Sequence, residues 1–137
     1  MIVYFSGRFS KKKEDLICKV VNFCQDQMFP DIDDIYLNFE GMLPKNAQNL
    51  RSGKELADYC GDCMYEEDKE FTIRLNKRLP IPQLELTLMH EMVHVDQYLK
   101  GKEMDNTSPY FERWQEKEAH KKELELQTIF HSQLRKD

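Results

Sequence analysis

The sequence predicts a small α+β protein with an N-terminal helix, a small antiparallel or mixed sheet, and two later helices. Its 137 residues fit a single domain, here residues 1–137, with one hydrophobic core. Apolar and polar residues alternate in two segments, 35–39 and 71–75, as they do in half-buried strands. In three longer segments, apolar residues recur three and four positions apart, which is typical of amphipathic helices. The order of these segments is that of an α+β domain.

The first forty residues predict a strand, a helix and a second strand. Residues 2–5 form a short run rich in β-formers. Ser10 is a suitable N-cap for a helix over residues 11–28, whose apolar residues share one face. The helix should end near Phe29, which is followed by a proline. The alternating segment 35–39 is the next strand.

The middle of the chain is harder to interpret. Residues 41–54 are polar and rich in turn formers, and residues 55–60 could add a short turn of helix or strand. Residues 64–68 fit neither pattern clearly. The alternation at residues 71–75 is the clearest strand pattern in the chain.

Two helices are predicted after this strand. The first covers residues 82–101, begins just after Pro80 and ends with a basic residue and a glycine. It is apolar nearly all round, which is typical of a buried helix. A polar loop then leads to a helix over residues 110–134, with a break near its first turn.

The buried helix carries HEMVH at residues 90–94, an H-E-x-x-H motif. One helical turn separates His90 from His94, so both rings project from one face and can bind one zinc ion. Glu91 can act as a general base on a metal-bound water. The alternative is a pair of hydrogen-bonded histidines on an ordinary helix. Because buried histidines need polar partners, a zinc ion is the simpler explanation.

A catalytic zinc ion usually takes three protein ligands and keeps one position for water. The third ligand is expected in the C-terminal helix, where acidic residues are dense. Glu118 is the first choice because the small Ala119 would let two helices approach closely. Glu116 and His120 are the alternatives.

These segments resemble a known group of enzymes. TLMHEMVHVDQYLKG followed by PYFERWQEKEAHKKEL resembles the small gluzincin-type zinc metallopeptidases, and the Glu118-Ala119 pair is similar to that of the ImmA/IrrE-like peptidases. EFTIRLNKRLPIPQLELTLMHEMVH is similar to the SprT-like proteins, although the third histidine of that group is missing here. The resemblance covers residues 71–126 and implies a zincin-like fold, a Zn²⁺ cofactor and hydrolysis of peptide bonds. Lys121 and Lys122 depart from the apolar continuation of the ImmA/IrrE-like helix.

The expected mechanism needs a protein or peptide substrate and a donor for the oxyanion. Tyr98, Tyr110 and His131 are the candidate donors. An extended substrate could pair with an exposed strand edge at residues 62–68. The alternative function is that of a catalytically inactive, zinc-stabilised interaction protein, although a structural site has no need of Glu91.

Charge and composition exclude other classes. The net charge is −5 and the isoelectric point about 5.4, which argues against nucleic acid as a partner, and the basic run at residues 11–13 is short. No apolar run could span a membrane and no signal-peptide pattern is present, so a cytoplasmic location is expected. The sequence does not determine the oligomeric state.

The chain has four cysteines. Cys60 and Cys63 form a C-x-x-C pair that lacks a second pair at zinc-binding spacing, because Cys18 and Cys24 fall in the first predicted helix. We therefore interpret Cys60 and Cys63 as incidental thiols at a turn.

Overall fold

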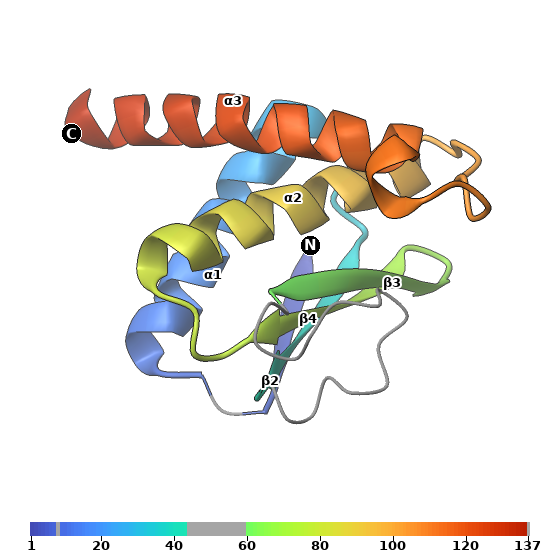
Figure 1. Cartoon of the computed structure of the whole chain (residues 1–137). Coiled ribbons are helices and arrows are strands. Elements are labelled where there is room, and N and C mark those ends of the chain that lie inside the picture. Colours follow the sequence, from blue (N-terminus) through green and yellow to red (C-terminus); the bar gives the residue numbers. More distant parts are fainter. Residues whose placement is uncertain (8, 44–59, 137) are drawn as a thin grey trace.

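The computed structural model describes residues 1–7, 9–43 and 60–136 and has the predicted α+β fold (Figure 1). In chain order the elements are β1 (Ile2–Ser6), α1 (Lys11–Met28), β2 (Tyr36–Met42), β3 (Gly61–Glu67), β4 (Glu70–Asn76), α2 (Ile81–Leu99), the 3₁₀ helix η3 (Tyr110–Glu112) and α3 (Trp114–Lys136). In the described part of the chain, none of the helices combines the length and hydrophobicity that crossing a membrane requires.

The four strands form one mixed sheet in the order β1-β2-β4-β3. β2 is parallel to both β1 and β4, and β3 is antiparallel to β4. Leu37 and Phe39 of β2 pair in register with Phe71 and Ile73 of β4, and all four side chains are buried. This alternation gives the sheet one apolar face, and Figure 1 shows α1 and α2 lying on it.

α1 forms as predicted. The Ser10 side chain accepts a hydrogen bond from the backbone N–H of Lys13 at 3.2 Å, which caps the first turn. At the other end the N–H of Phe29 donates to the Gln25 carbonyl oxygen. The apolar face of the helix is buried in the core through Ile17, Val20, Val21, Phe23 and Cys24.

α2 is the central helix. It packs against α1, β3, β4 and α3, and Figure 1 shows α3 stacked on it from the side opposite the sheet. Thirteen of its 19 residues are buried. Because other elements pack on several sides of α2, its sequence is apolar in nearly every direction. Its polar side chains must therefore form hydrogen bonds or ion pairs inside the protein.

The last predicted helix is broken where the sequence indicated. η3 ends at Glu112, the next residue Arg113 has an extended backbone (φ −69°, ψ 131°), and α3 begins at Trp114. Ala119 and Phe130 of α3 are buried, and the Phe130 ring packs on Phe23 of α1 with 5.1 Å between ring centroids. α3 therefore covers both other helices.

Four interpretations of the middle segment are completed, corrected or left untested by the structure. Residues 64–68 belong largely to the strand β3, which is an edge strand as expected for residues 62–68. Cys63 lies within β3 and not at a turn. Gly41 and Met42 extend β2 into the segment predicted to be turn-rich. The rest of that prediction, over residues 44–54, and nearly all of the short element predicted over residues 55–60 lie outside the described residues.

Candidate metal centre

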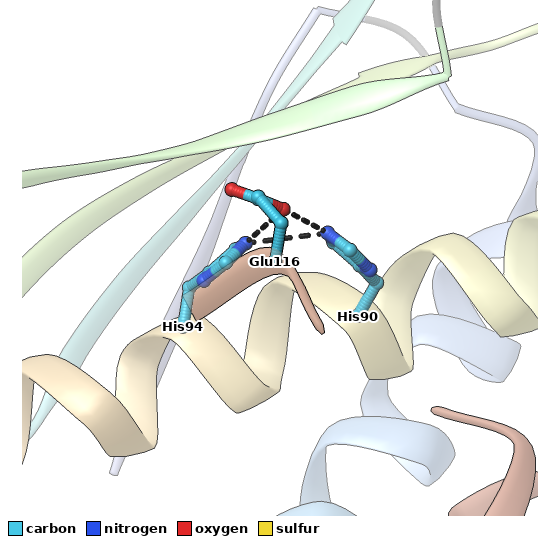
Figure 2. Close-up of side chains that lie close together, drawn as sticks. All are labelled: His90, His94 and Glu116. Carbon is cyan, nitrogen blue, oxygen red and sulfur yellow. Dashed lines mark hydrogen bonds and ion pairs between the residues drawn. The ribbon is translucent and has the colours of Figure 1, made fainter. Parts of the chain in front are cut away.

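Three ligand-type atoms converge above α2 (Figure 2). The Nε2 atoms of His90 and His94 are 3.2 Å apart. Oε1 of Glu116 lies 2.9 Å from Nε2 of His90 and 3.1 Å from Nε2 of His94. All three side chains are at most 12% exposed. The structure therefore contains a buried group of two histidines and one glutamate that could hold a metal ion.

The helices explain this placement. His90 and His94 are one turn apart on α2, so their rings share a face, with 4.8 Å between centroids. Glu116 lies in the first turn of α3, which crosses over that face. Ala119, fully buried, lies one turn further along α3, and its small side chain permits the close approach of the two helices.

Both histidines are oriented by a hydrogen bond at the other ring nitrogen. Nδ1 of His94 lies 2.8 Å from Oε1 of Gln97, and Nδ1 of His90 lies 3.3 Å from Oε1 of Glu123. Gln97 is turned so that its amide nitrogen donates to the Gln115 carbonyl oxygen and to Glu118, which leaves its oxygen for His94. Both partners are acceptors, so each Nδ1 carries a proton and each Nε2 of a neutral ring presents a lone pair to the site.

The donor set fits a metal ion. Two Nε2 lone pairs and a carboxylate oxygen facing one another at 2.9–3.2 Å repel unless a cation lies among them. A tetrahedral zinc ion bound at about 2.0–2.1 Å separates its ligand atoms by roughly 3.3 Å, close to the distances in this group. Two imidazole nitrogens and one carboxylate oxygen are a common ligand set for catalytic zinc.

Without a metal ion, protons supply the positive charge. Burial disfavours a charged His90, but its hydrogen bonds with Glu116 and Glu123 prevail and raise its pKa to about 10. The pKa of His94 is likewise raised, with burial opposing the shift and the hydrogen bond to Glu116 favouring it. Burial also opposes charge on Glu116, yet the two histidines lower the pKa of this carboxyl well below its usual range. In the metal-free protein the two protonated rings thus balance the carboxylate of Glu116, and a bound metal ion would take the place of their protons.

Glu91 lies next to this group and is only 4% exposed. Burial raises its pKa, although the positive charges of His90 and His94 lower it. A carboxylate whose proton affinity is raised in this way is a stronger base than an exposed glutamate. This is the property that the sequence interpretation required of Glu91.

The site opens into a cleft of about 390 Å³. It is lined by Cys63 and Met64 of β3, by the two histidines and Glu91 of α2, and by residues that follow α2, among them Asn106 and Arg113. Because Gly61 has no side chain, β3 can lie close to α2: a Cβ atom there would be 2.9 Å from the Thr87 methyl group. The candidate metal centre is therefore accessible to a small molecule or an extended chain.

The structure places Glu116, and not Glu118, beside the two histidines. Glu118 lies apart from the histidines: it accepts a hydrogen bond from Gln97 at 3.0 Å and pairs with Lys102 at 3.6 Å. Two residues along a helix correspond to a rotation of about 200°, so Glu116 and Glu118 cannot face the same point. Glu116, placed second by sequence, is the residue beside His90 and His94.

His120 is not part of the group formed by His90, His94 and Glu116, but its ring lies near that of His90. Its Nδ1 lies 2.7 Å from Glu123, and its ring is 4.6 Å from that of His90. His90, His120 and Glu123 form a second, more exposed group of metal-ligating side chains. Tyr110, which lines the cleft, has its hydroxyl 3.4 Å from Nε2 of His120.

The other two candidate donors lie in different places. Tyr98 lines the cleft, with its ring stacked on Tyr65 at 5.4 Å between centroids and also packed on Phe71. His131 pairs with Glu85 near the start of α2 and does not line the cleft. It follows Glu116 by 15 residues on α3, or about 22 Å at 1.5 Å per residue, which separates it from the candidate metal centre.

Sequence reasoning missed Gln97 and Glu123. Gln97 follows His94 by three residues on one helix, a spacing at which side chains meet, so this partner could have been found. Glu123 comes from another helix and gave no signal in the sequence, because only the packing of α3 on α2 brings it to His90.

Comparison with protein-family models, with curated proteins and with solved structures gives no match. What is established is the fold and a buried group of two histidines and a glutamate that could hold a metal ion.

Proposed function

We propose that this protein is a zinc-dependent peptidase. The observation that carries the proposal is the convergence of Nε2 of His90, Nε2 of His94 and Oε1 of Glu116 within 3.2 Å of one another, in an open cleft that Glu91 also lines. The motif places a general base directly beside the first ligand, as zinc peptidases require. The resemblance to gluzincin-type peptidases supports the same assignment.

The number of ligands favours a catalytic site over a structural one. Structural zinc sites usually close with four protein ligands, whereas catalytic sites use three and keep a position open. Among the described residues, the group around His94 contains three ligand side chains. The cleft leaves room for water and substrate on the open side.

Zinc held by His90, His94 and Glu116 would supply a water of lowered pKa and polarise the carbonyl to be cleaved. Glu91 takes the proton from the attacking water and passes it to the leaving amine. Its raised pKa suits both halves of this transfer. Gln97 and Glu123 keep the two imidazole rings in the orientation that binds the metal.

Tyr110 is our candidate donor to the oxyanion that forms on the substrate. It lines the cleft from η3. Burial and the negative charge of Glu116 raise the pKa of its hydroxyl, so it stays protonated and able to donate. Tyr98 remains a second candidate, although its ring is already packed on those of Tyr65 and Phe71.

An extended peptide could lie along β3. This strand is an edge of the sheet, and it forms one wall of the cleft. Within the described part of the chain β3 pairs with β4 alone, and backbone hydrogen bonds along its other side would hold a substrate without requiring a particular sequence. We therefore propose a protein or peptide substrate.

The test is cleavage of a library of quenched fluorescent peptides by zinc-loaded protein. The variants are Glu91→Gln, which removes the base, and Glu125→Gln, which makes the same change at an exposed position of α3. We expect all three proteins to bind one zinc ion, and the Glu91→Gln protein to cleave about 10²–10⁴-fold more slowly than the other two. A zinc-loaded wild type that cleaves no peptide, or a Glu91→Gln protein of equal activity, would contradict the proposal. The first result would favour an interaction protein stabilised by zinc.

A further inference from the structure

Arg113 is a half-buried arginine in the wall of the cleft that contains the candidate metal centre. Its Nε–H donates to the Ser108 carbonyl oxygen at 2.9 Å. Among the residues that the structure describes, no carboxylate forms an ion pair with Arg113. The two terminal amino groups of the guanidinium therefore keep the planar fork that binds carboxylates.

The other charged side chains of the cleft are either ion-paired or belong to the proposed catalytic group. Arg74, which also lines the cleft, makes a two-point ion pair with Asp62, with N–O distances of 2.8 and 2.6 Å. Glu116 belongs to the proposed metal centre and Glu91 is the proposed base. Arg113 is thus the cation of the cleft that remains available to a ligand within the described part of the chain.

The position of Arg113 is fixed relative to the metal centre. Its backbone carbonyl oxygen accepts hydrogen bonds from the N–H groups of Glu116 and Lys117, each at 3.1 Å. The loop that holds its Nε–H is itself tied to α3, because Gln115 donates to the Asp105 carbonyl oxygen at 2.7 Å and accepts from the Asp105 N–H at 3.2 Å. A cation placed this rigidly can select a substrate and not merely attract it.

We propose that Arg113 is a specificity-determining residue that binds a carboxylate group of the substrate inside the cleft. This inference rests on the proposed peptidase function and names its substrate class: peptides with an acidic side chain or a free C-terminal carboxylate close to the bond that is cleaved. Both groups present the same planar pair of oxygens to the guanidinium. The net charge of −5 gives the protein no general attraction for acidic chains, so the selection depends on this one local contact.

The test uses three short peptide hydroxamates, whose hydroxamate group binds zinc and reports the metal centre directly. They differ only in the C-terminal residue, which is an amidated glutamate, an amidated glutamine, or a glutamine with a free C-terminal carboxylate. Calorimetry with the zinc-loaded full chain measures their dissociation constants. We expect one or both carboxylate compounds to bind about 10–100-fold more tightly than the neutral one, the range for a hydrogen-bonded charge pair. Comparing the two carboxylate compounds distinguishes a side-chain carboxylate from a terminal one.

Two variants distinguish a direct contact with Arg113 from a long-range effect of positive charge. Arg113→Gln can still donate to Ser108 but lacks the charge, and it should reduce the preference for carboxylates to about one. Lys117→Gln removes the same charge from an exposed position of α3 and should preserve the preference. Wild-type protein that binds the neutral and acidic compounds equally would overturn the inference and leave the peptidase proposal standing. An Arg113→Gln protein that keeps the preference would also overturn it. A chain that binds neither zinc nor any hydroxamate would overturn both proposals.

Discussion

Gln97 provides a direct test of how the protein orients its metal ligands. Its side chain is fully buried and makes three hydrogen bonds, one accepted from His94 and two donated to the Gln115 carbonyl oxygen and Glu118. Replacing it with leucine keeps a similar volume and removes all three. Replacing it with glutamate keeps the acceptor for His94 but loses both donors and places a negative charge beside Glu118.

The sizes of the two effects follow from these contacts. Each buried hydrogen bond contributes about 1 kcal/mol, and more where a polar partner is left unsatisfied, so Gln97→Leu should lower the free energy of unfolding of the metal-free protein by about 3 kcal/mol. Loss of the bond to His94 should weaken zinc binding about 10–100-fold. At saturating zinc this weaker binding removes a further 1.4–2.7 kcal/mol, roughly, of stabilisation. Gln97→Glu should destabilise the metal-free protein but change zinc affinity by less than about threefold.

Urea denaturation of the metal-free proteins and competition with a zinc chelator measure the two quantities separately. The reasoning predicts that the leucine variant loses both stability and zinc affinity, whereas the glutamate variant loses mainly stability. If Gln97→Leu binds zinc as tightly as the wild type does, Gln97 does not orient His94. If both variants lose zinc affinity equally, the effect comes from general loosening of the fold and not from the hydrogen bond.

Two further predictions concern pH and the core. Burial disfavours a charged His90, but the hydrogen bonds with Glu116 and Glu123 raise its pKa from 6.5 to about 10 in the metal-free protein. Its stabilising contribution is therefore complete below about pH 6.5 and is lost as the pH rises toward 10, while zinc affinity, which needs the neutral ring, increases over the same range. Urea denaturation of the metal-free protein and zinc titration across this range should show these opposite trends, and parallel trends would contradict the assignment. Leu88→Ala, at a fully buried position of α2, should lower the free energy of unfolding by about 3 kcal/mol, and a loss below about 1 kcal/mol would show that this side chain is poorly packed.

Local signals in the sequence were sufficient for the helices. Ser10 marks the start of α1 and the prolines at 80 and 82 mark the start of α2, each within one residue of its observed first position. The apolar character of α2 in nearly every direction predicted its burial, and the spacing of His90 and His94 predicted their shared face. These properties depend on residues close together in the chain.

Properties that depend on distant residues were not predictable in the same way. β3 is an edge strand beside a cleft, so its side chains are unevenly buried and show no alternation. The parallel pairing of β2 with β4 leaves no mark in either strand alone. Glu116 and Glu118 are both acidic and nearly adjacent, and only the rotation of α3 about its axis decides which of them faces the histidines.

The measurement that tests the central claim most directly is the zinc content of the purified chain, by elemental analysis, in the wild type and in Glu116→Ala and Glu118→Ala. The two substitutions remove the same group from positions two residues apart in the first turns of α3. We predict one zinc ion per chain in the wild type and in Glu118→Ala, and loss of the ion in Glu116→Ala. Zinc retained in full by Glu116→Ala, or a wild type that binds no zinc when the metal is supplied, would contradict the account.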